Sequence, residues 1–169
     1  MEIIRAKHMG FCFGVAGAIS MCHKVSSDEK NRDKRIYILG MLVHNEHVVN
    51  QLSKQGFKIV EEMDILQGKD ELQKGDIVII RAHGTSERIF NILKEKEVEI
   101  YDATCVFVTQ IRKTLVEMEK KGYDILFIGD KNHPEVKGII SFGKRVTVCN
   151  DLEAVSYTHL RAHETCADL

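Results

Sequence analysis

The 169-residue sequence has a single proline and lacks three features that mark whole protein classes: long apolar runs, a surplus of one charge, and closely spaced cysteines. No apolar run approaches the ~20 residues of a transmembrane helix, and the first residues do not resemble a secretory signal peptide. Lys plus Arg number 24 and Asp plus Glu 25, so the net charge is −1. That balance does not favour broad binding to nucleic acid or to a membrane surface. We therefore expect a cytoplasmic protein.

The cysteines do not form the pattern of a disulfide scaffold. They are five in number, an odd count, and they lie far apart in the sequence, at positions 12, 22, 105, 149 and 166. In a reducing compartment such cysteines are free thiols or metal ligands. The scarcity of proline also argues against disordered linkers, and a hydrophobic content of 44% is enough for a core.

Apolar patterns of strand and helix type alternate along the chain. Strands are predicted at 2–7, 35–43, 57–60, 76–82, 98–105, 124–129 and 145–149, and helices begin near 13, 45, 86, 106 and 134. This alternation favours an α/β fold of repeated units, with a mostly parallel sheet flanked by helices. We divide the chain into an N-terminal strand and cysteine loop (1–12), a first α/β unit (13–105), an incomplete second unit (106–155) and a tail (156–169).

Two cysteines stand where a strand passes into a helix. Cys105 ends a short apolar strand and begins an amphipathic helix, and Cys12 has the same place near the N-terminus. Backbone N–H groups and the dipole at a helix start favour a thiolate. Cys22 and Cys149 fall on apolar segments and are predicted to be core residues. Two thiolates do not complete a zinc or iron–sulfur site, so the residues alone indicate only a metal or redox centre with a phosphate-like ligand.

Three predicted strands are followed closely by a histidine: His44, His83 and His133. The carboxyl ends of parallel strands share one edge of a sheet, which is the usual ligand edge. Histidine there can bind phosphate, move a proton or bind a metal. Any one of the three could equally be an ordinary surface residue. As a set they predict a binding site at this edge.

Several short segments together resemble the 4-hydroxy-3-methylbut-2-enyl diphosphate reductase (LytB) family, the iron–sulfur enzymes that end the methylerythritol phosphate route of isoprenoid biosynthesis. In chain order they are Gly10–Val15, Val43–Asn45, Ala82–Gly84, Asp102–Cys105 and His133–Gly138. The resemblance implies a trefoil-like enzyme of three α/β units around a 4Fe–4S cluster. Such an enzyme converts its allylic diphosphate substrate to isopentenyl and dimethylallyl diphosphate. It takes electrons from a donor such as ferredoxin or flavodoxin.

The resemblance also implies roles for individual residues. Cys12 and Cys105 match two cluster ligands, His44, His83 and His133 match residues that bind the diphosphate or line the active site, and Glu135 matches the acid that delivers protons. The family's third cysteine lies beyond the end of this chain. The sequence therefore resembles an inactive N-terminal fragment of about half the enzyme.

Three alternatives remain open from the sequence. The chain could be a non-catalytic phosphate-binding α/β module, or a zinc hydrolase using His44, His83 and His133, although these lack the short spacing of most zinc sites. Residues 156–169 have no counterpart in the family and look like translated adapter sequence. His159, His163 and Cys166 in this tail could instead bind zinc, because histidines four residues apart share one helix face.

Overall fold

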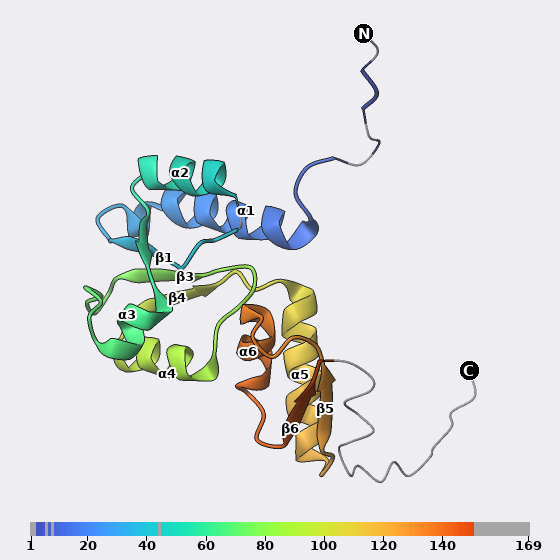
Figure 1. The fold of residues 1–169 in the computed structure, drawn as a ribbon. Coiled ribbons are helices and arrows are strands. Elements are labelled where there is room, and N and C mark those ends of the chain that lie inside the picture. The colour runs from blue at the N-terminus through green and yellow to red at the C-terminus, as the bar shows by residue number, and fades with distance from the viewer. Residues whose placement is uncertain (1–2, 6, 8, 44, 151–169) are drawn as a thin grey trace.

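The structure is a computed structural model that describes residues 3–5, 7, 9–43 and 45–150. Strands and helices alternate along this part of the chain, as the sequence predicts (Figure 1). In order they are α1 (Phe13–Ser27), η1 (Glu29–Asn31), β1 (Ile36–Leu39), α2 (Glu46–Lys54), β2 (Lys58–Val60), α3 (Glu62–Gln67), β3 (Ile77–Ile80), α4 (Glu87–Glu95), β4 (Glu99–Asp102), α5 (Val106–Lys120), β5 (Ile125–Ile128), α6 (Pro134–Ile140) and β6 (Val146–Cys149).

The strands form two parallel sheets. The first has the order β2-β1-β3-β4, and the second pairs β5 with β6. The last strand of the first sheet, β4, ends at Asp102, and α5, which leads to the second sheet, begins at Val106. The α/β class with parallel pairing is therefore confirmed. All four strands of the first sheet point their carboxyl ends to one edge, where ligands bind in such folds.

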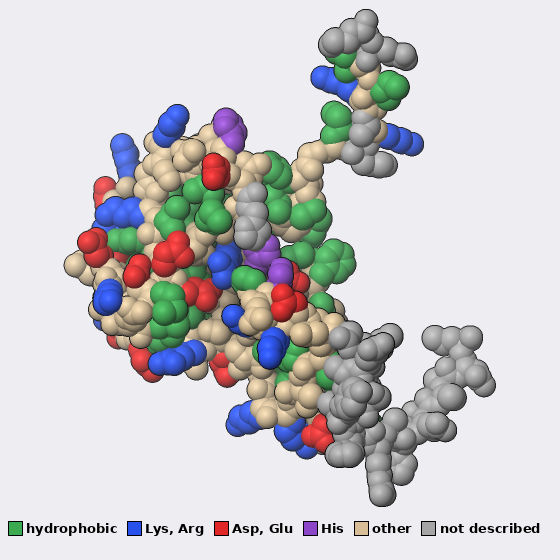
Figure 2. Space-filling model, in the orientation of Figure 1, with side chains coloured by type: hydrophobic (Ala, Val, Ile, Leu, Met, Phe, Trp, Pro, Cys, Tyr) green, Lys and Arg blue, Asp and Glu red, His purple; other side chains and the backbone are tan. Residues whose placement is uncertain are grey.

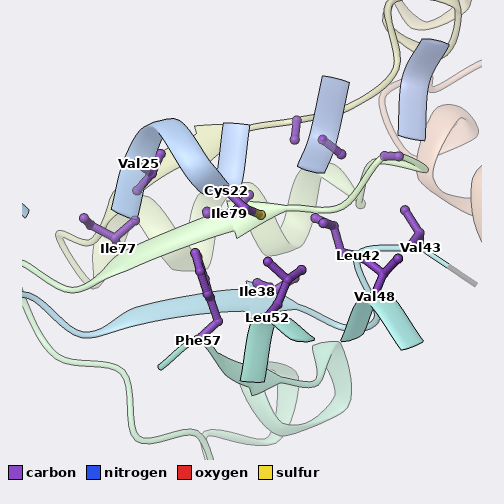
Figure 3. Packing of buried hydrophobic residues seen from close by; sticks show 13 residues of the cluster. Cys22, Val25, Ile38, Leu42, Val43, Val48, Leu52, Phe57, Ile77 and Ile79 are labelled. Atoms are coloured by element: carbon purple, nitrogen blue, oxygen red, sulfur yellow. The ribbon is translucent and has the colours of Figure 1, made fainter. Parts of the chain in front are cut away.

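Helices cover both faces of the first sheet (Figure 1). Successive side chains of a strand point to opposite faces. Ile38, Ile77 and Ile79 accordingly pack with α1 and α2, whereas Leu39, Val78 and Ile80 pack with α3 and α4. Burial on both faces explains why β3 is a continuous apolar run. Figure 3 shows the α1–α2 side of this core, in which Cys22 lies beside Ile79.

The second sheet is smaller and packs against α5 and α6. Val108, Leu115 and Ile139 form its buried centre, and Ile125, Phe127 and Val146 pack against them. Figure 1 shows α6 between α5 and the first unit, so that α6 touches both parts of the molecule. The end of α6 is joined to the start of α4, because the backbone N–H of Glu87 donates to Ser141 Oγ at 3.0 Å.

Two predicted strands are corrected. Residues 3–5 and 7, the described part of the predicted strand 2–7, form no strand, and Ile3 and Ile4 are 75% and 85% exposed. A strand needs a neighbour to accept its backbone hydrogen bonds, and Figure 1 shows this segment leading away from the body. The strand predicted over 35–43 stops at Leu39. Gly40 takes φ +63°, a left-handed conformation that ends it.

The predicted helix starts are confirmed where their caps can be seen. Asn45 accepts a hydrogen bond from the N–H of Val48, and Ser86 accepts one from Ile89. Pro134 occupies the first turn of α6. Among the described residues, no helix is both long and apolar enough to span a membrane.

Candidate functional site

Cys12 and Cys105 occupy equivalent places in the fold. Each is the N-cap residue of a 15-residue helix, Cys12 of α1 and Cys105 of α5. Neither side chain makes a capping hydrogen bond, so neither sulfur is used to complete its helix. Cys12 is exposed and Cys105 is half-buried. Both thiols remain available as ligands at positively polarised helix starts.

The two cysteine turns meet through Gly14. A side chain at Gly14 would put its Cβ 2.9 Å from Cys105 Sγ, so only glycine allows α1 to approach this closely. A hollow of about 180 Å³ lies between the turns, and its lining includes Phe13, Gly14, Thr104 and Cys105. Soft thiolates beside such a hollow suit zinc or an iron–sulfur cluster. Within the described residues no group of three or more potential metal ligands is assembled, so the metal-binding roles predicted for Cys12 and Cys105 stay predictions.

The turn that carries His83 is joined directly to the Cys105 turn. The N–H of Cys105 donates to the carbonyl of Ala82, the residue before His83, at 2.9 Å. Gly84 lies against the Thr104 side chain, where an added Cβ would be 3.1 Å from Thr104 Cγ2. Thr104 is held in turn by Asp102, whose Oδ1 accepts its backbone N–H at 3.0 Å. The half-buried His83 therefore stands on a turn that is fixed to the Cys105 turn at the carboxyl edge of the sheet.

The edge predicted to be shared by the three histidines does not include His133, because His133 follows β5 of the second sheet, whereas His83 follows β3 of the first. Helix α6, which begins after His133, instead packs against the His83 turn. Gly138 packs on the backbone of Thr85, with only 3.5 Å between its hypothetical Cβ and the Thr85 carbonyl oxygen. His133 is the N-cap of α6, and its Nδ1 accepts the N–H of Glu135 at 3.3 Å. In a neutral imidazole whose Nδ1 accepts, the proton is on Nε2, which can donate to an anion. Glu135 is half-buried in the first turn of α6.

The predicted site residues are thus connected by a continuous series of contacts. It runs from the Cys12 turn through Gly14 to Cys105, from Cys105 to the His83 turn, and from there to α6. Figure 2 shows histidine side chains at the waist between the upper and lower parts of the molecule, with charged side chains beside them. His44 lies outside the described residues, as do His159, His163 and Cys166 of the tail. Their predicted roles are therefore still predictions.

Cys22 and Cys149 are core residues, as predicted. They are 0% and 4% exposed. Burial also raises the pKa of the Cys22 thiol to about 12, which keeps it protonated and unreactive. These two cysteines are therefore set apart from Cys12 and Cys105 by their surroundings.

Sequence reasoning missed the residues that hold the site together. Gly14 makes its closest approach, Gly138 lies in contact with the Thr85 backbone, and the ion pair of Glu62 with Arg81 supports the His83 turn. Glycines such as these give no signal by themselves, because glycines also end helices and form loops. The Glu62–Arg81 pair joins segments that are distant in sequence, and only the folded chain shows it.

The sequence model described as LytB protein matches residues 3–167. A Fusobacterium nucleatum protein named 4-hydroxy-3-methylbut-2-enyl diphosphate reductase is 54% identical over 153 residues, covering 90% of this chain and 18% of that protein. A Caldanaerobacter subterraneus protein of the same name is 45% identical over 139 residues, covering 82% of this chain and 46% of that protein. The chain thus spans half or less of these relatives. The matched range includes most of the tail predicted to be non-native.

Two solved structures resemble the fold. A structure titled as (E)-4-hydroxy-3-methyl-but-2-enyl diphosphate reductase, the terminal enzyme of the non-mevalonate pathway, has a TM-score of 0.76 and 32% identity. The match covers 92% of this chain and 53% of the chain in that structure. The corresponding reductase from Plasmodium falciparum has a TM-score of 0.74 and 31% identity, with 87% of this chain and 44% of that chain covered.

Proposed function

The chain belongs to the LytB protein family, and from this membership we propose that it forms part of an iron–sulfur reductase of isoprenoid biosynthesis. The proposed reaction converts 4-hydroxy-3-methylbut-2-enyl diphosphate to isopentenyl and dimethylallyl diphosphate. The carbon–oxygen bond breaks, the hydroxyl leaves as water after taking a proton, two electrons enter the allyl system, and a second proton adds to carbon. The electrons come from a donor such as ferredoxin or flavodoxin.

One observation above all supports this proposal. The thiol of Cys105 and the imidazole of His83 stand on turns that are joined by the hydrogen bond from Cys105 N–H to Ala82 C=O, at 2.9 Å. The turn that carries a ligand for soft metals and the turn that carries a group able to bind phosphate oxygens are therefore joined through their backbones. This is the arrangement that a reaction at a metal centre on a phosphorylated substrate requires.

We assign the following roles to the chain's own residues. Cys12 and Cys105 would be two of the protein ligands of a 4Fe–4S cluster, which would supply electrons and a Lewis-acidic iron. His83 and His133, together with His44, bind the diphosphate through ring N–H donors. Glu135 holds the proton that the leaving hydroxyl takes. The exposed apolar side chains of Phe13, Val106 and Phe107 around the thiols would limit the access of water once they are covered.

The proposal is tested with a protein that contains this sequence and spans the full length of its relatives. After anaerobic purification we expect broad visible absorption, iron and sulfide in matching amounts, and turnover with a reduced dye. Cys105→Ser should remove both the colour and the activity. Cys22→Ser is the matched control, because Cys22 is buried away from the site, and it should keep both. A colourless protein that binds pyrophosphate would instead support the non-catalytic phosphate-binding module, and stoichiometric zinc would support the hydrolase.

A further inference from the structure

The turn of residues 81–85, which carries His83, is stabilised by the ion pair of Arg81 with Glu62. Glu62 is not part of any of the sequence motifs. Glu62, in the first turn of α3, accepts from Arg81 Nη2 at 2.9 Å and from Thr85 Oγ1 at 2.9 Å. Both donors reach the same oxygen, Oε1, so a single carboxylate holds the two ends of the turn. His83 lies between these two ends in the sequence.

Arg81 also joins this turn to the end of β1. Its Nε donates to the carbonyl of Gly84 at 3.4 Å, a hydrogen bond between the two sides of the turn. Its Nη1 lies where a side chain at Gly40 would be, 2.9 Å from the hypothetical Cβ. Gly40 has φ +63° and begins the segment that leads along the sequence to His44. The guanidinium therefore connects the ends of β1 and β3 at the ligand edge.

The pair is shielded enough for its loss to matter. The side chains of Arg81 and Glu62 are 20% and 29% exposed, and Thr85 is 2% exposed. Removing one partner of a partly buried ion pair leaves the other charge poorly solvated, and the surrounding backbone then rearranges. The residues most affected would be those of the turn itself.

We propose that Glu62 and Arg81 are positioning residues, which act through the 81–85 turn to hold the His83 imidazole in the orientation that binds a diphosphate. This inference rests on the proposed function, because it assigns a task to the same site. Neither residue need touch the substrate, because Arg81 and Glu62 contact each other and the Gly84 and Thr85 residues of the turn.

The same sheet offers a matched pair at its opposite edge. Arg35 and Asp76 precede β1 and β3, and Arg35 Nη2 lies 2.6 Å from Asp76 Oδ2. This pair joins the same two strands, but at their amino ends, away from His83. Breaking it tests what the loss of an ion pair does to the fold alone.

Two charge-neutral double variants separate positioning from stability. Glu62→Gln with Arg81→Met removes one charge of each sign near the site, and Arg35→Met with Asp76→Asn does so at the far edge. The first readout needs no ligand: exchange of the Gly84 amide, which donates to the Arg81 carbonyl at 2.9 Å. We expect the first variant to speed this exchange by about tenfold and the second to leave it within about twofold, because protection reports local opening.

The second readout is the affinity for inorganic pyrophosphate, followed by the NMR signal of the His83 ring. We expect the Glu62/Arg81 variant to bind at least about fivefold more weakly, and the Arg35/Asp76 variant to change by less than about twofold. Unchanged amide exchange and unchanged affinity in a folded Glu62/Arg81 variant would overturn the inference. If pyrophosphate does not shift the His83 signal of the wild-type chain, the result counts against the proposed function. The exchange rate of the Gly84 amide would still decide whether the Glu62–Arg81 pair holds the turn.

Discussion

At the scale of single residues, the site depends on positions where no side chain can be accommodated. Gly14 and Gly17 both lie in α1, but their surroundings differ. A Cβ at Gly14 would be 2.9 Å from Cys105 Sγ, whereas a Cβ at Gly17 would meet nothing within 4 Å. The same helix therefore contains a glycine required by a close approach and one that is not.

This difference gives a direct prediction for stability. Gly14→Ala should destabilise the protein by about 1–3 kcal/mol, because the new methyl group overpacks the contact with Cys105. Gly17→Ala should stabilise it by about 0.5–1 kcal/mol, since alanine loses less backbone entropy in a helix. Urea unfolding of the two variants beside the wild type measures both. Equal effects at the two positions would show that α1 does not press on Cys105.

A second prediction at this scale concerns Glu135. In a protein that spans the full length of its relatives, Glu135→Gln should slow turnover by about 10²–10⁴-fold, the usual contribution of a general acid. The amide keeps the size of the side chain and can still lie in the first turn of α6, so the cluster colour and substrate binding should persist. Loss of colour in this variant would point to a role in holding the metal centre. Absorption spectra and turnover with a reduced dye separate the two outcomes.

At the scale of elements, side-chain hydrogen bonds join a helix to the strand that follows it. Glu119, near the end of α5, accepts the backbone N–H groups of Lys144 and Arg145 just before β6. These hydrogen bonds, more than the charges of the same residues, hold the pKa of Glu119 below its ordinary 4.5. The carboxylate therefore fixes the start of β6 to α5 as long as it is ionised.

The lowered pKa predicts how this link responds to acid. A carboxyl whose pKa is lower in the folded state stabilises the fold fully above its unfolded value of 4.5, and this stability is lost as the pH falls through the lower folded value. Wild type should therefore be more stable than Glu119→Gln at neutral pH, and the difference should shrink in acid. Glu117→Gln, an exposed position on the same helix, is the control and should show no such pH dependence. Urea midpoints across the acid range measure the trend.

The elements also show what the sequence could predict and what it could not. The continuous apolar run of β3 and the caps Asn45 and Ser86 are local signals, and they predicted the helices and strands well. The predicted strand over 2–7 depends on a partner strand elsewhere, which local patterns cannot supply. The site divides in the same way. Cys12, Cys105 and His83 were predicted from their places after expected strands, although no strand forms before Cys12 among the described residues. Glu62 and Gly14, by contrast, matter only through contacts between distant segments.

At the scale of the whole molecule, large apolar side chains stay exposed around the thiols. Phe13, Val106 and Phe107 are 72%, 53% and 69% exposed, and an apolar pocket of about 240 Å³ lies between α5 and β5. Monomeric proteins rarely expose contiguous apolar surface of this kind without a partner. The relatives are at least about twice as long as the matched region, so they have residues beyond it that could cover such surfaces.

Activity should therefore require more than the 169 residues. Under the proposed function, Cys12 and Cys105 are the two thiols that the described residues would give a cluster, and a missing third protein ligand would let iron and sulfide escape, especially in air. The open surface around Cys105 would also admit water to a reaction that needs a fixed, dry field. We expect this chain, reconstituted anaerobically with iron and sulfide, to show no turnover, whereas a protein of the relatives' full length should turn over under the same conditions. Adding pyrophosphate to the short chain should still shift the His83 signal, because the His83 turn and α6 are complete in it. Comparable turnover by both proteins would mean that Cys12, Cys105 and the histidines suffice without the rest of the fold.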